Sequence, residues 1–390
     1  QLLDVGHAVT LVLPFLPPEE QDQAFHGSAY FDSQQDQETF VRGWIREQAP
    51  GKEEKMGLLF YLGKYSVDFG SILPVGDVTE IFQAAPHSDF CILEEPEHLT
   101  WFHFGRRWTD IFDYVVGIMH TNYLAYAWRF GFFGPVKTVF LYGVNLLVCE
   151  IHCNRVIKLS DAVQYLPKAT TCNVHGVRER FLTIGMDAGT VPQDFTQGAY
   201  FLGKMAWEKG YRHLFILATA YHRRTQNILS IVLYGNGHDL PAIRHACEVN
   251  PSLAGVKFYG DALDHGSPDL RKYRVFLNPA TSDVICTATA EALAMGKIVV
   301  VRKHPSNAFF SIFRNCITFS SEDDFAQAVD SAMSMTPLPL SKEERSALSW
   351  TAATDRLVDA SRMDPNSPLR NKFGLALHRF HRAFTQFLRP

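Results

Sequence analysis

The chain has 390 residues, of which 46% are hydrophobic and 20% are charged, and it contains 30 phenylalanines. This composition excludes low-hydrophobicity disorder and predicts a globular protein of about two domains. The formal net charge of −4 gives no global attraction to nucleic acid or to an anionic membrane. No nucleic-acid partner is therefore expected, and membrane binding would require a local basic patch.

Short β-branched runs alternate with helical stretches in the first half of the chain, which predicts a parallel α/β sheet. The chain opens on a helix end that leads into a strand, without a signal or transit segment, so we expect an amino-terminal piece to be missing. The segment Leu166–Gln197 is rich in Gly, Asn, Asp and Pro and is interpreted as an irregular interdomain linker. Strands are expected at His7–Leu13, Gly57–Tyr61, Phe90–Leu93, Tyr114–His120 and Arg155–Leu159.

A second α/β series follows the linker. Its strands are expected at Ala199–Leu202, Ile228–Tyr234, Val256–Tyr259, Val275–Asn278, Ile298–Arg302 and Cys316–Phe319. We predict two Rossmann-like domains facing a cleft, with ligands at the carboxyl ends of the strands. The predicted divisions are 1–180, 181–340 and a final part, 341–390, that holds a crossing helix and a basic amphipathic helix.

Neither a metal site nor a membrane span is predicted. The seven cysteines include no C-x-x-C pair, which fits a reducing compartment. Cys149, His152 and Cys153 lack a second ligand pair, so we expect them to pack in a helix. The apolar run Gly131–Leu147 is interrupted by polar residues before it reaches the length of about 20 residues that a spanning helix needs.

The most specific stretch is N-P-A-T-S-D-V-I-C-T-A-T-A-E-A-L-A-M-G-K, residues 278–297, which follows a strand and opens a helix. Backbone N–H groups near Thr287 and Thr289 would be free at the helix amino-terminus, a site that suits a diphosphate. Asp283 and Glu291 are carboxylates that could accept hydrogen bonds from sugar hydroxyls. An ordinary loop and helix with two solvated carboxylates is an equal alternative.

Two further stretches could contact the same ligand. Lys204 and Lys209 follow a strand end, where cations can neutralise a leaving diphosphate, although surface lysine pairs are common. Gly235 and Gly237 form a Gly-x-Gly turn that would let a ligand approach the backbone. Taken alone, that turn is weak evidence. No Asp-x-Asp pair follows a strand, so we expect no metal in the active site and no cofactor.

Polar residues also follow strands in the first half. His120, Thr121 and Asn122 come at the end of a buried strand, which is a typical site position. The run Ile92–Trp101 follows from the preceding strand and contains a cluster of Glu94, Glu95, Glu97 and His98. A solvated acidic loop is the alternative interpretation. Together these residues form the expected acceptor side of the cleft.

The carboxyl-terminal stretch Leu369–Pro390 combines aromatic and basic residues at helical spacing and contains no acidic residue. This pattern is typical of a helix on a membrane surface, while a last helix packed on the first domain is an equal alternative. The aromatic segment Tyr123–Phe140 is a second interfacial candidate. The residues expected to face the membrane are Lys372, Phe373, Arg379, Phe380, Arg382 and Phe384.

Several motifs together resemble the retaining glycosyltransferases of GT-B fold, which include sucrose and glycogen synthases, and more closely the digalactosyldiacylglycerol synthases. They are I-L-E-E-P-E-H-L, R-R-W-T-D, G-I-M-H-T-N-Y-L, C-N-V-H-G-V, G-A-Y-F-L-G-K-M, Y-G-N-G, C-T-A-T-A-E-A-L-A-M-G-K and H-P-S-N. The resemblance extends to about Arg356. The broader family usually has Glu at the position of Asp283 and Arg at that of Lys204, and the lipid galactosyltransferases share these departures.

The resemblance implies residue roles. Lys204 and Lys209 would hold the diphosphate, and Glu291 the ribose hydroxyls. Asp283 would hold the transferred sugar, and His120 would lie beside its 6-hydroxyl. The catalytic residues would thus be His120, Asp283 and Lys209.

The resemblance also implies a reaction and a location. Galactose would pass from UDP-galactose to monogalactosyldiacylglycerol with retention, at the plastid outer envelope, by a peripherally bound enzyme. The family opens with a strand and a glycine-rich loop that would precede this chain. Another lipid glycosyltransferase of the same fold, or a non-catalytic lipid-binding relic, are the alternatives.

Overall fold

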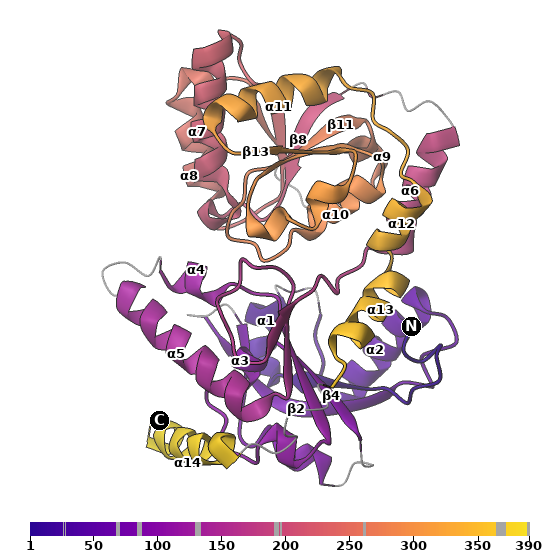
Figure 1. Cartoon of the computed structure of the whole chain (residues 1–390), viewed down its shortest axis with the longest axis vertical. Coiled ribbons are helices and arrows are strands. Elements are labelled where there is room, and N and C mark those ends of the chain that lie inside the picture. Colours follow the sequence, from indigo (N-terminus) through magenta and orange to yellow (C-terminus); the bar gives the residue numbers. More distant parts are fainter. Residues whose placement is uncertain are drawn as a thin grey trace.

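The computed structural model describes residues 1–25, 27, 29–67, 71–83, 88–128, 134–190, 195, 197–259, 263–363 and 372–387. These residues form an upper and a lower lobe (Figure 1). The upper lobe consists of the middle and later parts of the chain. The lower lobe holds the first part, and the last helices return to it.

The upper lobe is built on a six-stranded sheet in the order β10-β9-β8-β11-β12-β13, in which all neighbouring strands are parallel. The predicted second strand series is therefore confirmed. Helices cover the two faces of this sheet (Figure 1). The elements are β8 (Gln197–Leu202), α7 (Tyr211–Thr225), β9 (Ile231–Tyr234), α8 (Leu240–Glu248), β10 (Val256–Tyr259), α9 (Pro268–Arg271), β11 (Tyr273–Asn278), α10 (Thr287–Ala294), β12 (Ile298–Arg302), β13 (Cys316–Phe319) and α11 (Glu322–Ser334).

The core of the lower lobe is a parallel four-stranded sheet in the order β4-β5-β6-β7. Its central strand β5 is buried at every position because α5 covers one of its faces. The elements are β4 (Phe90–Glu94), α3 (Pro96–Thr100), β5 (Tyr114–Met119), α4 (Tyr123–Ala127), α5 (Gly134–His152), β6 (Arg155–Lys158) and β7 (Ala169–Thr171).

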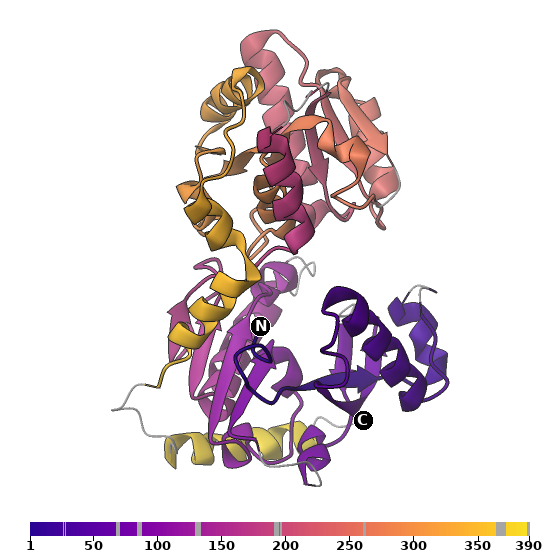
Figure 2. The ribbon, with the colours of Figure 1, turned by 90° about the vertical axis from the view of Figure 1, so that its right-hand side faces the viewer.

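The first strands form a separate sheet, a division that the sequence pattern did not indicate. This sheet has the order β1-β2-β3, with β1 parallel and β3 antiparallel to β2. Figure 2 shows this indigo part standing beside the magenta part that carries the four-stranded sheet. Its elements are β1 (Thr10–Phe15), α1 (Pro18–Phe25), α2 (Gln34–Gln48), β2 (Gly57–Ser66) and β3 (Ser71–Pro74).

The prediction of an irregular linker at Leu166–Gln197 was wrong. This segment contains β7 and the helix α6 (Glu179–Thr190). Phe181 and Leu182 on α6 are buried in the core of the upper lobe. Apolar residues at helical spacing therefore outweighed the glycines and polar residues in the same segment.

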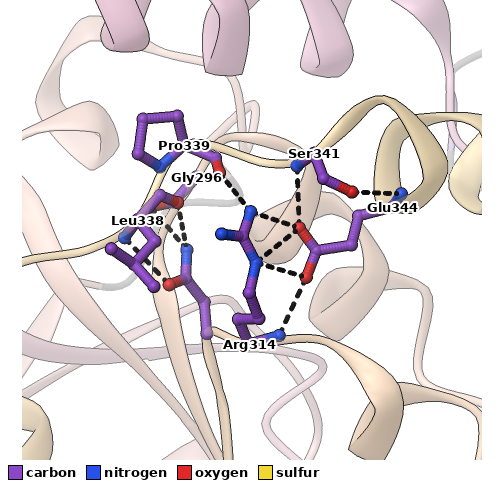
Figure 3. A network of polar contacts seen from close by, with 7 residues as sticks. Gly296, Arg314, Leu338, Pro339, Ser341 and Glu344 are labelled. Carbon is purple, nitrogen blue, oxygen red and sulfur yellow. Dashed lines mark hydrogen bonds and ion pairs between the residues drawn. The ribbon is translucent and has the colours of Figure 1, made fainter.

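Two helices carry the chain back from the upper to the lower lobe. α12 (Lys342–Leu348) is fixed to the upper lobe by Glu344, whose carboxylate accepts hydrogen bonds from Arg314, one of them at 2.9 Å (Figure 3). α13 (Trp350–Ala360) then packs on the lower lobe, where Arg155 Nε donates to the carbonyl of Ala360 at 3.0 Å. Arg356 on the same helix donates to the carbonyl of Asn173 at 2.6 Å.

The expectation of no helix long enough to span a membrane does not hold for α5. This helix has 19 residues and a mean hydropathy of 1.3, so it could cross a membrane by length and composition alone. Its interruptions are tolerated because Pro135 lies in the first turn and because Asn145 is buried and accepts a hydrogen bond from the Trp101 indole at 3.0 Å. Val148, Cys149 and His152 near its end are buried inside the lobe, although only 28% of its apolar window is buried.

The last helix, α14 (Lys372–Phe387), lies across the lower end of α5 (Figure 1). It packs on the lower lobe through polar residues, since His378, His381 and Thr385 are 6%, 2% and 3% exposed. Phe373 and Phe380 instead are 64% and 66% exposed. Arg379 and Arg382 are exposed too, while the side chains of Lys372 and Phe384 lie outside the described residues. The helix therefore packs on the first domain, as one alternative expected, and leaves exposed two of the phenylalanines that were expected to face a membrane.

Candidate functional site

Lys209 and Asp283 are brought together by two loops at the carboxyl ends of β8 and β11. Lys209 ends a short 3-10 helix and precedes Gly210, whose φ is +93°. A Cβ at Gly210 would lie 2.8 Å from the backbone nitrogen of Ala280, so only glycine lets the two loops meet. The Lys209 ammonium consequently reaches Asp283 Oδ1 at 2.8 Å, with the carboxylate 13% exposed.

The carboxylate of Glu291 contacts the buried His265, which in turn contacts the buried Tyr200. Its Oε2 lies 2.8 Å from His265 Nδ1, and His265 Nε2 lies 2.6 Å from the hydroxyl of Tyr200. Burial lowers the pKa of His265, against the opposing effect of the hydrogen bond with Glu291. Neither His265 nor Tyr200 was predicted as a site residue. The spacing of polar residues gave no signal for them, because each comes from a different loop or strand.

The two predicted threonines at the start of α10 differ in exposure. Thr287 is exposed at the first position of the helix, where its backbone N–H group lacks a helical partner. Thr289 is fully buried, and its hydroxyl accepts a hydrogen bond from Asn278 at 3.1 Å. The Thr289 side chain therefore ties the helix to β11, and donor binding by the backbone N–H groups at this helix start stays a prediction.

The Gly-x-Gly turn after β9 packs against the loop that follows β8. A Cβ at Gly235 would lie 2.0 Å from the carbonyl oxygen of Gly203, and one at Gly237 would lie 2.4 Å from that of Met205. Met205 also donates its N–H to the carbonyl of Asn236 at 2.9 Å. The contact between two loops thus requires the glycines, and their contact with the donor stays a prediction.

Lys204 lies on the first of these two loops and is exposed. Close by, Glu208, His238 and Asp239 offer ligand atoms that all lie within 4.8 Å of one another. Asp239 also accepts the N–H of Trp207 at 3.0 Å. These three residues could hold a cation beside the donor loops, a possibility that the absence of an Asp-x-Asp pair did not suggest.

In the lower lobe, His120 lies between two carboxylates at the end of β5. Its Nε2 is 3.2 Å from Glu94, and its Nδ1 is 3.2 Å from Glu95. Burial alone would lower the pKa of His120, but the hydrogen bond with Glu94 and the charges of both carboxylates outweigh it and raise the pKa. Glu95 also accepts hydrogen bonds from Thr121 and, at 2.6 Å, from the hydroxyl of Tyr123.

Glu95 occupies the left-handed region of the backbone, with φ of 56° and ψ of 66°. This conformation is unusual for a residue with a side chain and often marks a functional site. It turns the chain so that Glu95 faces His120. The acidic cluster after β4 thus contributes Glu94 and Glu95 to the site.

The expectation that Glu97 and His98 line the acceptor side was wrong, because both point into the core. Glu97 is fully buried, which raises the pKa of its carboxyl well above the usual value. His98 is 8% exposed, contacts Ser71 at 3.0 Å and stacks on Tyr123. Asn122 has a structural role as well, since its side chain accepts the N–H of Ala125 at the start of α4.

His175 connects the two halves of the site. It lies in the C-N-V-H-G-V motif, and its ring packs edge-on against Trp350 with centroids 5.0 Å apart. Burial lowers the pKa of His175, and the charges of Glu291 from the upper lobe and of His120 and Glu94 from the lower lobe also act on it. Charged groups of both lobes therefore act on one imidazole to which the sequence analysis had assigned no role.

This chain is similar to known glycosyltransferases. A family model described as Glycosyl transferases group 1 matches residues 196–335, the upper lobe. Digalactosyldiacylglycerol synthase 2, chloroplastic, of Arabidopsis thaliana is 42% identical over 380 residues, which cover 95% of this chain and 79% of that protein. Digalactosyldiacylglycerol synthase 1, chloroplastic, of the same plant is 44% identical over 362 residues. Those residues cover 92% of this chain and 44% of that relative, so the chain spans less than half of its length.

Among solved structures, alpha,alpha-trehalose 6-phosphate synthase from Burkholderia multivorans superposes with a TM-score of 0.54 at 9% sequence identity. The superposition covers 91% of this chain and 98% of that one. At this identity the likeness concerns the fold alone, and it confirms the predicted pair of Rossmann-like lobes in GT-B arrangement.

Proposed function

Because this chain belongs to the family of digalactosyldiacylglycerol synthases, we propose that it transfers galactose from UDP-galactose to monogalactosyldiacylglycerol. The product is digalactosyldiacylglycerol, and the configuration at the anomeric carbon is retained. The observation that supports the proposal is that Glu291 from the upper lobe and His120 and Glu94 from the lower lobe all act by their charges on the pKa of His175. A donor sugar and an acceptor sugar bound from opposite lobes would meet there.

The upper lobe would bind the donor. Glu291 accepts hydrogen bonds from the ribose hydroxyls, and His265 fixes its carboxylate in the orientation that this needs. Lys204, Lys209 and the amino-terminus of α10 stabilise the diphosphate. Lys209 approaches the diphosphate while still paired with Asp283, which in turn orients the galactose hydroxyls. No metal is required for these contacts.

The lower lobe would bind the acceptor and the 6-hydroxyl side of the transferred galactose. His120 is a hydrogen-bond donor when protonated, and its carboxylate neighbours favour that form. In the reaction the bond between the anomeric carbon and the diphosphate breaks as the 6-hydroxyl of the acceptor bonds to that carbon from the same face. The proton of this hydroxyl passes to the departing phosphate oxygen. Stabilisation of the diphosphate by Lys209 and Lys204 supplies most of the rate enhancement.

The lipid acceptor requires contact with a bilayer, and the lower lobe offers a surface for it. Phe373 and Phe380 are exposed on α14 beside the exposed Arg379 and Arg382. An apolar and basic surface of this kind suits peripheral binding to an anionic membrane. The chloroplastic names of both relatives support a plastid location, and we propose that the surface binds the outer envelope.

The proposal is tested by UDP release from UDP-galactose on vesicles that contain monogalactosyldiacylglycerol, compared with vesicles of phosphatidylcholine alone. We expect galactolipid-dependent release that is lost in Glu291→Ala. Glu322→Ala is the matched control, because Glu322 is an exposed glutamate of α11 that pairs with Arg223 on the surface. Release that does not depend on the galactolipid, or that survives in Glu291→Ala, would refute the proposal.

A further inference from the structure

Four histidines gather where α14 packs on the lower lobe, and together they form a histidine cluster. His103 follows α3, His152 ends α5, and His378 and His381 lie one turn apart on α14. They are 4%, 0%, 6% and 2% exposed. The ring of His152 lies at the centre in edge-on packing, with centroids 5.2 Å from His103, 5.7 Å from His378 and 6.4 Å from His381. Imidazole rings therefore form the centre of the contact between α14 and the lower lobe.

The rings of the histidine cluster are placed for the neutral form of histidine. Nδ1 and Nε2 of His152, Nδ1 of His378 and Nδ1 of His381 have no hydrogen-bond partner among the described residues. His381 Nε2 lies 3.1 Å from the carbonyl oxygen of Trp101, so this nitrogen carries the proton of the neutral ring. A protonated imidazole has an N–H donor on both nitrogens, and a buried charge without acceptors costs much free energy. The docked helix therefore favours neutral imidazoles over imidazolium ions.

Burial is the main reason why these rings resist protonation. It lowers the pKa of all four histidines, and that of His378 falls to about 4. The rings also act on one another, since the charge of His103 lowers the pKa of the other three. Protonation of one ring therefore makes protonation of its docked neighbours less favourable.

The charged groups on the surrounding elements do not offset this effect. Arg107, which is 6% exposed, and Arg382 of α14 lower the pKa values in the histidine cluster further. Asp110 and Asp77 act in the opposite direction, and Asp110 is already paired with Arg107 at 2.6 Å. The net effect of burial and charge is a lowered pKa at each of the four rings.

We propose that the histidine cluster is an acid-sensitive latch, which docks α14 on the lower lobe while its imidazoles are neutral and releases the helix when they are protonated. After release the rings return to water, where the pKa of histidine has its ordinary value of 6.5. Below pH 6.5 the released state therefore binds protons that the docked state does not bind. Docking is at full strength above this pH and is lost as the pH falls below it.

The number of histidines makes this pH dependence steep. Each ring that regains its ordinary pKa on release weakens docking about tenfold per pH unit below 6.5, so the two rings on α14 alone give about 10²-fold and all four give about 10⁴-fold. The exposed Phe373 and Phe380 move with the helix, so acid would also detach the proposed membrane surface from the lower lobe. The latch itself does not depend on the proposed reaction.

The test is hydrogen–deuterium exchange of the whole chain between pH 5.5 and 8, followed by mass spectrometry and corrected for the intrinsic pH dependence of exchange. We expect the protection of amides in 372–387 to be constant above pH 7 and to fall by at least about 100-fold per pH unit below 6.5. The strands β8–β13 should keep their protection over the same range, because they belong to the other lobe.

Two variants separate the outcomes. His152→Phe/His378→Phe keeps two rings for the edge-on packing but removes two titrating groups, so the loss of protection should become less steep by at least about tenfold per pH unit. Circular dichroism and the protection of 372–387 at pH 7.5 show whether this variant is folded and docked, and His378→Phe alone takes its place where it is not. His245→Phe removes an exposed histidine of α8 and should leave the pH dependence unchanged.

Three results would overturn the inference. The first is protection of 372–387 that does not change between pH 7.5 and 5.5. The second is its loss at the same pH as that of β8–β13, which would show general acid unfolding. The third is the same steepness in the unchanged chain and in the docked phenylalanine variant.

Discussion

The carboxylate of Glu291 lies 2.8 Å from Nδ1 of His265, and this contact links a residue at the site to the core of the upper lobe. A second hydrogen bond continues into the core, since His265 Nε2 lies 2.6 Å from the hydroxyl of Tyr200. A buried hydrogen-bond chain of this kind fixes the orientation of its outer member. Glu291 is thus held in place before any ligand arrives.

Removal of the Tyr200 hydroxyl, at the inner end of this hydrogen-bond chain, should affect donor binding more than the rate of catalysis. In Tyr200→Phe the ring remains and only the hydroxyl is lost, so the net loss is about 1 kcal/mol. We expect KM for UDP-galactose to rise about fivefold while kcat changes less than twofold. Steady-state kinetics measure both constants. Tyr221→Phe removes a comparable hydroxyl that bonds Asp330 away from the site and should leave KM unchanged.

The ion pair between Lys209 and Asp283 should matter for the chemical step. Asp283→Asn removes the charge that positions Lys209 and one acceptor for the sugar, so kcat should fall by about 10²–10³. Asp269→Asn, which affects an exposed pair with Lys272, is the control and should keep full activity. An unchanged kcat in Asp283→Asn would show that this pair is only structural.

The pKa of His120 should show the effect of its two carboxylate neighbours. Its raised folded-state pKa means that the protonated ring stabilises the fold below the ordinary value of 6.5. This stabilisation is lost as the pH rises through the folded-state pKa, and acceptor binding should weaken in the same range. NMR titration of the ring should give a midpoint above 6.5 that decreases in Glu94→Gln. A midpoint that is the same in both proteins would contradict this account.

The exposed phenylalanines of α14 should contribute to vesicle binding. Phe380→Glu places a charge on the surface proposed to face the membrane, and we expect binding to fall about tenfold or more, given about 1.5–3 kcal/mol for the burial of a Phe side chain. Sedimentation with anionic vesicles measures the effect. Ile216→Glu adds the same charge at an exposed apolar position of α7 on the upper lobe, and its effect should be much smaller.

The sequence predicted those features that depend on local patterns. The β8–β13 series could be predicted because each strand is a short apolar run, and the segments after these strands led to the prediction of Lys209, Asp283 and Glu291 as site residues. The histidine at the end of β5 was readable for the same reason. Side-chain direction was less predictable, because Glu94, Glu95 and Glu97 look alike in sequence and only the left-handed backbone at Glu95 separates the site from the core.

Contacts between distant segments could not be predicted from spacing. His265 reaches Glu291 and Tyr200 only through the fold. The amphipathic pattern of α14 indicated an apolar face directed inward or into a membrane. It did not indicate that His378 and His381 would dock against His152, 226 and 229 positions earlier, because the partners belong to different elements.

The most direct test of the central claim is the identity of the lipid that acquires label. The chain is incubated with UDP-[¹⁴C]galactose and vesicles containing monogalactosyldiacylglycerol, and the labelled lipid is isolated and its anomeric configuration determined by NMR. We predict labelled digalactosyldiacylglycerol with an α-linked outer galactose, formed by the chain and absent with Glu291→Ala. Label in a different lipid, a β-linked product, or no transfer by a chain that is folded and binds the vesicles would contradict the account.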